Sequence, residues 1–141
     1  MIPPLIPPQA PLEELIHGPL PTPEPPIRVP DADAVYGMST VGDGGRVSDR
    51  HVLGSLGWIP GTRLEAIAVD GVVVVRPIPG GAVRITSDGY LRIPYRVRRQ
   101  LCLFVGDRVL LIGHRRHRQL VLHPPAALDE RLRASLALME R

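Results

Sequence analysis

Short runs of apolar residues, separated by turns that contain glycine, make up the chain from Val35 to about residue 125. Runs of this length that are rich in Val, Ile and Leu are typical of β-strands. The first half predicts strands at 35–41, 46–48, 63–69 and 72–75 and a short helix at 49–56. Asp70-Gly71, between the last two strands, is a strong signal for a two-residue hairpin turn. Ser48 or Asp49 is a suitable N-cap for the helix.

Residues 82–125 repeat this order of elements. A strand leads to a turn at Asp88-Gly89, a short strand ends at Ile93-Pro94, a helix runs over 95–101, and a hairpin has arms at 108–112 and 119–122. A unit of about 45 residues is too small to bury its own apolar face, so two units are expected to share one core. The predicted fold is mainly β, with two tandem β-β-α-β-β repeats, 35–77 and 82–125, that form one pseudo-two-fold barrel.

Two further segments flank the repeats. Residues 1–34 hold eleven of the seventeen prolines, and because proline cannot donate to a helix or a ladder, this segment is expected to be disordered. It is either a solvated tail or a docking segment for a protein partner that binds polyproline II. Residues 126–141 predict an amphipathic helix, with one apolar face made of Leu128, Leu132, Leu136 and Met139. That helix packs either on its own barrel or on another chain.

Charge is unevenly distributed along the chain. The net charge is +3, but residues 1–40 carry −4, whereas residues 80–125 carry +7 from nine Arg against Asp88 and Asp107. All seventeen basic residues are Arg, and a guanidinium binds phosphates and guanine edges in a bidentate geometry that Lys cannot offer. A polyanion is therefore the natural partner of the second repeat.

Other function classes lack the residues that they need. No apolar run approaches the roughly 20 residues that span a bilayer, and no signal peptide is recognisable, so a cytoplasmic protein without membrane contact is expected. Cys102, the one cysteine, lies between two leucines and is expected to be a buried core residue. His114 and His117 sit among arginines that oppose a cation, so no metal or other cofactor is expected. No serine has an evident base, and no catalytic residue is predicted.

The residues that carry the repeat resemble a known family. They are Ser87–Pro94, Val97–Leu101 and Val105–Val109 in the second unit, and Asp43–Val47, Leu56–Trp58 and Pro60–Leu64 in the first. In order and spacing these segments resemble the swapped-hairpin DNA-binding domain of the AbrB, MazE and SpoVT superfamily, in the tandem arrangement of MraZ-like proteins. The resemblance implies that two units interleave their hairpins, within or between chains. It also implies that basic residues of the Gly-containing loop and the short helix bind DNA.

Candidate DNA-binding residues come from the family pattern and from the charge pattern. The Arg that follows the loop Gly in the family is Arg46 in the first unit but Tyr90 in the second, whereas the helix arginines Arg98 and Arg99 occur only in the second. Like charges crowded on one short element cost stability unless an anion relieves them. The predicted DNA-binding residues are Arg46, Arg50, Arg84, Tyr90, Arg92, Arg96, Arg98 and Arg99.

The sequence thus predicts a non-enzymatic, sequence-specific or semi-specific DNA-binding protein, a bacterial transcriptional regulator associated with the nucleoid. Its partner is double-stranded DNA, and it is expected to form a homo-oligomer through the C-terminal helix. The tip of the second hairpin, residues 114–118, is either a solvated turn or an auxiliary contact to DNA or to a partner. The alternative function is an antitoxin or scaffold that acts mainly by binding a protein partner through residues 1–34 or the terminal helix.

Overall fold

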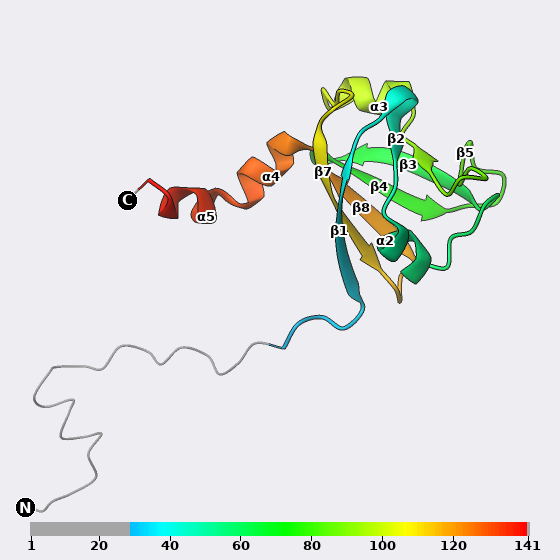
Figure 1. The fold of residues 1–141 in the computed structure, drawn as a ribbon, viewed down its shortest axis with the longest axis horizontal. Helices are drawn as coiled ribbons and strands as arrows, with labels where there is room; N and C mark the ends of the chain where they lie inside the picture. The colour runs from blue at the N-terminus through cyan, green and yellow to red at the C-terminus, as the bar shows by residue number, and fades with distance from the viewer. Residues whose placement is uncertain (1–28, 141) are drawn as a thin grey trace, which may run out of the picture. The chain divides into compact units, whose positions relative to one another are not determined.

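The computed structural model describes residues 29–140, so most of the proline-rich segment predicted to be disordered, residues 1–34, lies outside the described residues. The described chain is mainly β, with an antiparallel sheet of six strands, a separate ladder of two strands and several short helices (Figure 1). The mainly β fold expected from the sequence is confirmed.

Most elements fall close to the apolar runs that predict them. The first half contains β1 (Ala34–Thr40), the 3₁₀ turn η1 (Asp43–Gly45), β2 (Arg46–Val47), α2 (Arg50–Ser55), β3 (Arg63–Val69) and β4 (Val72–Pro77). The second half contains β5 (Val83–Arg84), β6 (Leu91–Arg92), α3 (Tyr95–Gln100), β7 (Arg108–His114) and β8 (Gln119–His123). The carboxylate of Asp49 caps α2 by accepting the N–H of Val52 at 3.0 Å. Asp70 and Gly71 both have positive φ, as a type I′ turn requires.

Strand pairing crosses repeatedly between the two halves of the chain. The large sheet has the order β1-β7-β8-β4-β3-β5, and its neighbouring strands are antiparallel. The first strand of each half pairs with the other half, because β1 pairs with β7 and β5 pairs with β3. The β3–β4 and β7–β8 hairpins meet through β4 and β8, and β2 pairs with β6 in the separate ladder. Each half therefore completes the sheet of the other.

The predicted barrel is wrong, because the sheet does not close. β1 and β5 are its two edges and do not pair with each other. Closure requires hydrogen-bonded neighbours on both sides of every strand, and β2, β5 and β6 each have only 2 residues. Strands so short, set between Gly-containing turns, cannot bridge the two edges. The result is an open sheet with a small ladder beside it.

One hydrophobic core joins both halves, as the sequence predicts. The sheet contributes inward side chains from β3, β4, β7 and β8, and the fully buried ones are Leu64, Val73, Val75, Val109, Leu111, Leu120 and Leu122. Val52 of α2, Val97 of α3 and Leu91 of the ladder pack into the same cluster. Burying each such side chain stabilises the fold by about 1.5–3 kcal/mol. α2, α3 and the ladder therefore cover one face of the sheet.

The opposite face of the sheet, which we call the outer face, also carries apolar residues. The register places Tyr36, Ile112, Val121, Val74 and Ile67 opposite one another on five neighbouring strands. Side chains alternate between the faces of a strand, so these five residues form one cross-strand row. The end members Tyr36 and Ile67 are 62% and 42% exposed, and the three between them are half-buried.

The C-terminal segment forms two short helices, α4 (Pro125–Arg131) and α5 (Arg133–Leu138), in place of the single helix predicted at 126–141. Leu132 interrupts the helix with φ −105° and ψ 21°. Of the predicted apolar stripe only Leu128 is half-buried, while Leu132, Leu136 and Met139 are exposed. A helix of this length is marginal without packing, and α5 buries none of its residues. No helix within residues 29–140 has both the length and the apolar character that crossing a bilayer demands.

α4 covers one end of the outer face. It lies against β7 and β8 and buries Ala127. Val72 and His123, whose side chains belong to the outer face, are buried although they lie outside the core cluster. Arg131 at the end of α4 donates a hydrogen bond from Nη2 to the carbonyl oxygen of Asp70, at 3.4 Å, in the β3–β4 turn. The helix therefore runs from the end of β8 toward that turn.

His123 should make the stability of this region depend on pH. Burial lowers the pKa of His123 below its usual 6.5, the positive charge of Arg131 acts in the same direction, and the backbone of Leu110 opposes both. The unfolded chain therefore takes up a proton before the folded chain does as the pH falls. Stability from neutral His123 is fully present above pH 6.5 and is lost progressively below that value. We expect the urea concentration at the unfolding midpoint to decrease when the pH is lowered from about 7.5 to about 5. The decrease should be smaller in His123→Leu.

The exposed His51 on α2 provides the control for this titration. His51→Leu removes a histidine that remains in water, so it should keep the pH dependence of the unmodified chain. An unchanged pH profile in His123→Leu would show that another group is responsible.

Candidate nucleic-acid interface

Two of the predicted DNA-binding arginines face each other across the small ladder. Arg46 on β2 and Arg92 on β6 are direct partners in the antiparallel register. The next pair, Val47 and Leu91, is buried in the core. Because side chains alternate along a strand, both arginines point away from the core. Like charges placed directly opposite each other destabilise a ladder, so this pair is a site where an anion would stabilise the protein.

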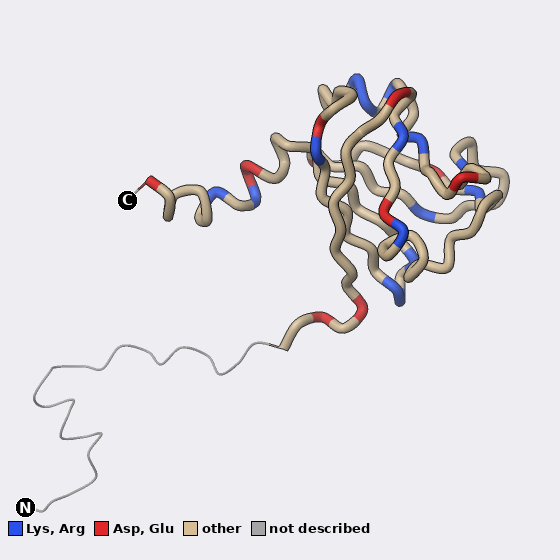
Figure 2. Tube along the Cα trace, in the orientation of Figure 1, with Lys and Arg blue, Asp and Glu red and all other residues tan. Residues whose placement is uncertain are grey.

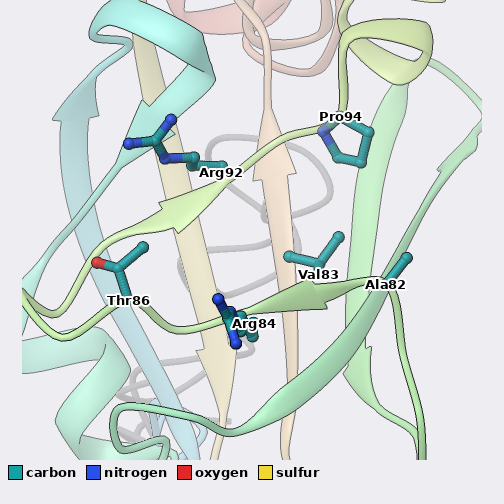
Figure 3. Close-up of a pocket in the computed structure, with 6 residues that line it drawn as sticks. All are labelled: Ala82, Val83, Arg84, Thr86, Arg92 and Pro94. Atoms are coloured by element: carbon teal, nitrogen blue, oxygen red, sulfur yellow. The ribbon is translucent and has the colours of Figure 1, made fainter.

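A second pair of arginines lies on the strands beside the ladder. Arg63 on β3 and Arg84 on β5 are register partners, and they are followed by the buried pair Leu64 and Val83. β5 lies against β6, and Arg84 and Arg92 line one surface hollow of about 540 Å³ (Figure 3). Four outward arginines thus occupy four neighbouring strands, and we call them the arginine row: Arg63, Arg84, Arg92 and Arg46.

Arg63 is a member of the row that the sequence did not single out. It opens β3 directly after the Gly61-Thr62 turn, but only its pairing with Arg84 connects it to the other arginines. Its Nη1 donates a hydrogen bond to the carbonyl oxygen of Gly81 at 3.1 Å. The remaining N–H groups of the guanidinium lie on an exposed residue, so it keeps donors for an anion.

Tyr90 supports an arginine from the other half of the chain. The guanidinium carbon of Arg46 lies 5.2 Å from the centroid of the Tyr90 ring, within the range of a cation–π interaction. Both residues are half-buried. The Tyr90 ring thus helps to hold Arg46 in place.

The arginines of α3 divide into two groups. Arg96 and Arg99 are exposed and stand three residues apart, so they lie on neighbouring positions of the helix surface. Arg98 is half-buried, its Nε donates a hydrogen bond to the carbonyl oxygen of Ile93 at 2.9 Å, and its guanidinium carbon lies 5.5 Å from the centroid of the Tyr95 ring. The structure therefore gives Arg98 a role in holding α3 in place, while Arg96 and Arg99 keep their donors for a ligand.

Gly45 is the point where the first half meets α3. Its carbonyl oxygen accepts the N–H of Ile93 at 2.9 Å, and its φ is +81°. A Cβ atom at this position would lie 2.5 Å from Nε of Arg98 and 2.6 Å from the carbonyl oxygen of Ile93. Only glycine fits this conformation and this contact, and the fit sets the position of α3 relative to the ladder.

Arg50 lies on a different part of the surface. It begins α2, is exposed, and lines a hollow of about 230 Å³ together with Tyr90, Trp58 and Asp88. Asp88 on the same lining makes this hollow less basic than the arginine row, although no ion pair joins it to Arg50 among residues 29–140. Tyr90 connects this hollow to the ladder, but Arg50 is not a neighbour of the arginine row in the strand register.

The arginine row has no acidic partner among the described residues. Between residues 29 and 140, ion pairs within 4.0 Å join only Arg76 to Glu65 and His114 to Asp31. Basic positions occur along α3, on β2 and on the strands beside them (Figure 2). The charge of the row and of α3 is therefore not neutralised by a carboxylate of this part of the chain.

The tip of the second hairpin is occupied by contacts to the start of the folded region. Arg115 donates from Nη1 to the carbonyl oxygen of Ala32 at 2.8 Å, and its backbone N–H donates to that of Asp33 at 2.8 Å. Nε2 of His114 lies 3.4 Å from a carboxylate oxygen of Asp31. The N–H of Asp33 is the largest influence that lowers the pKa of Asp31, and His114 adds to it against the effect of burial.

Asp31, Asp33 and His114 bring together ligand atoms within 4.8 Å of one another, a spacing that a metal ion accepts. However, Nδ1 of His114 accepts the N–H of His117 at 3.2 Å. The proton of the neutral ring then lies on Nε2, which faces Asp31. Both ring nitrogens are thus engaged, Nε2 with the Asp31 carboxylate and Nδ1 with the N–H of His117, so this cluster fits a hydrogen-bonded contact better than a metal centre.

The prediction that Cys102 is buried is wrong. Cys102 is exposed and has φ +51°. α3 ends at Gln100, and the N–H of Cys102 bonds to the carbonyl oxygen of Arg99. This left-handed position turns the thiol outward, while the next residue, Leu103, is buried. The apolar neighbours in the sequence therefore misled the prediction.

Comparison of the chain with known protein families, with curated proteins and with solved structures found no match. The functional interpretation of the arginine row and α3 therefore depends on their geometry and charge.

Proposed function

We propose that the protein binds double-stranded DNA through the arginine row and the exposed arginines of α3. The observation that carries this proposal is that Arg46 and Arg92 face each other on the ladder without a carboxylate partner among residues 29–140. Such a pair is relieved by an anion, and the DNA backbone presents phosphates at close, regular spacing. Arg donors also match phosphate oxygens and guanine edges.

The pairing of the strands supports an AbrB-like interleaved arrangement of two repeats. The first strand of each half pairs with the third strand of the other half, and the second strands, β2 and β6, pair with each other. Repeats with swapped hairpins would produce this pattern. In the proposal the open sheet keeps the family's connectivity without closing into a barrel, and the protein acts as a bacterial transcriptional regulator at the nucleoid, without enzymatic activity or a cofactor.

The contacts to DNA would differ between α3 and the ladder of β2 and β6. Arg96 and Arg99 project from a short helix and would contact phosphates, which sets affinity and salt dependence. Arg46 and Arg92 stand on a two-stranded ladder, an element narrow enough to enter the major groove, where Arg reads guanine. Arg98 would contribute through the placement of α3, because its Nε is already bonded to Ile93. Arg50 would make a secondary contact from α2.

A titration with salt tests the proposal. Fluorescence anisotropy with double-stranded fragments recovered with the protein from cells should give a slope of log K against log salt of about −4 to −6, since each phosphate contact contributes about −0.9. Recovery of DNA without enrichment of any sequence, together with a slope near zero, would contradict the proposal. A single-stranded fragment of the same sequence is the control and should bind more weakly.

A second candidate function, an antitoxin or scaffold that binds another protein, is favoured by the C-terminal segment. Leu132, Leu136 and Met139 remain exposed, and α5 buries nothing in this chain. We also propose that the protein forms a homo-oligomer through this segment, which would cover the same residues. A protein partner for the proline-rich residues 1–34 remains a proposal from the sequence alone.

A further inference from the structure

Two separate apolar surfaces of the chain are left uncovered. The first is the outer face of the sheet, where Tyr36 and Met38 on β1 and Ile67 and Val69 on β3 are exposed. The second is the segment around α5, where the exposed residues are Leu132, Leu136, Leu138 and Met139. Large apolar residues grouped on a surface indicate a contact with another apolar surface.

The uncovered part of the outer face has the shape of a strip across the strands. The row from Tyr36 through Val121 to Ile67 crosses five strands, a width of roughly 19 Å at about 4.8 Å per strand. On one side of the row lie the polar positions His114, Gln119 and Arg76 together with Glu65. An element that covers the row therefore has to run along it, across the strands.

The other side of the strip shows which element fits. There α4 lies against β7 and β8, its last residue is bonded to the β3–β4 turn, and the outer-face residues Val72 and His123 are buried. Residues on the same face of a strand recur at about 7 Å, and packed helices lie about 8–10 Å apart. A second helix placed on the row would thus lie directly beside α4. The segment 132–139 is about 12 Å long as a helix, which covers about three strands of the strip.

We propose that α5 of one copy packs on the outer face of the sheet of a second copy, beside its α4, and that the exchange is mutual. Such an exchange is two-fold symmetric, because each chain offers the same segment and the same face. α5 of the same copy does not reach this position, since Arg131 is bonded to Asp70 and only Leu132 separates the two helices. This inference deepens the proposed self-association and does not depend on DNA binding, because the arginine row lies on other strand positions; Arg63 shares the outer face of β3 but stands four residues from Ile67.

The test is the molar mass of the chain in solution without DNA. Sedimentation equilibrium should give a dimer for the full chain, and Ile67→Glu on the face or Leu136→Glu on α5 should each raise the dissociation constant at least tenfold. Both residues are at least 40% exposed, and Glu65 already stands on the same face of β3. Ile59→Glu is the matched control, because Ile59 is 65% exposed and belongs to neither surface.

Mixing the two variants separates this arrangement from other contacts. An equimolar mixture of Ile67→Glu and Leu136→Glu should regain dimers, because the intact face of one chain can accept the intact α5 of the other. If Leu136→Glu weakens the dimer but Ile67→Glu does not, α5 pairs with α5 and the inference is wrong. A monomeric full chain would also overturn it. Thermal melting of each variant identifies misfolding, and Tyr36→Glu at the other end of the row replaces Ile67→Glu if that variant does not fold.

DNA binding provides an independent readout. A dimer that forms as described but shows no salt-dependent binding would leave the exchange intact and contradict the proposed function. Salt-dependent DNA binding by a chain that stays monomeric would support the proposed function and contradict the exchange of α5.

Discussion

Replacing both Arg46 and Arg92 with Ala is expected to weaken DNA binding about 100-fold at moderate salt and to leave the fold intact. Each guanidinium that bonds to a phosphate or a base edge contributes about 1.5 kcal/mol, so two contribute about 3 kcal/mol. Folding should not suffer, because the two side chains point away from the core and face each other as like charges. Their removal relieves that repulsion. Anisotropy titrations at several salt concentrations measure both the affinity and a slope that is less steep by about 1.8.

Arg76→Ala combined with Arg133→Ala is the matched control for this experiment. It removes the same total charge from two positions outside the arginine row and α3, one of them paired with Glu65. If the control loses as much affinity as the Arg46 and Arg92 variant, the attraction is general to the charge of the chain and the row is not the interface.

Gly45→Ala is expected to destabilise the protein by about 3 kcal/mol. Placing a Cβ at φ +81° costs about 1–2 kcal/mol for a residue other than glycine. The rest comes from the approach of the new methyl group to the carbonyl oxygen of Ile93, which is part of the backbone and cannot turn away. Urea unfolding followed by the fluorescence of Trp58 measures the loss. The change should also disturb Arg98 and thereby α3.

Gly44→Ala separates backbone strain from the contact with α3. Gly44 also has positive φ, +71°, but its Cβ would meet only the end of the Arg92 side chain, at 3.1 Å. A flexible guanidinium can move aside, so this variant should lose only the conformational part, about 1–2 kcal/mol. Equal losses in the two variants would show that the contact between Gly45 and Ile93 contributes little.

The apolar pattern predicted the long strands and helices well, because the buried face of each element appears as a periodic run of apolar residues within that element. The Asp70-Gly71 turn and the Asp49 cap are local and were also readable. Whether the barrel closes could not be read from the sequence. Closure depends on the length of hydrogen-bonded pairing at β2, β5 and β6, and strands of two residues leave almost no periodic signal. The break at Leu132 was not predictable either, because the stripe of leucines continues through it without a helix-breaking residue.

The candidate site was predictable in composition and less so in arrangement. The cluster of arginines in the second repeat and Arg46 after the loop Gly were visible in the sequence. The register that sets Arg46 opposite Arg92, and Arg63 opposite Arg84, joins residues from different halves and exists only in the folded sheet. Arg98 was predicted as a DNA contact because of its charge, but its bond to Ile93 could not be inferred from the spacing.

The pairing of β1 with β7 has a consequence for how the chain folds. Ala34 is matched with His114, so β1 leaves the ribosome well before β7 and finds its neighbour only after the residues between them have been made. Contacts so distant in sequence slow folding, because a long loop must close before they form. During that interval β1 is an unpaired edge that can accept the β7 of another nascent chain. Nascent chains that are made side by side on one messenger RNA can therefore exchange β1 strands before each chain has completed its own sheet.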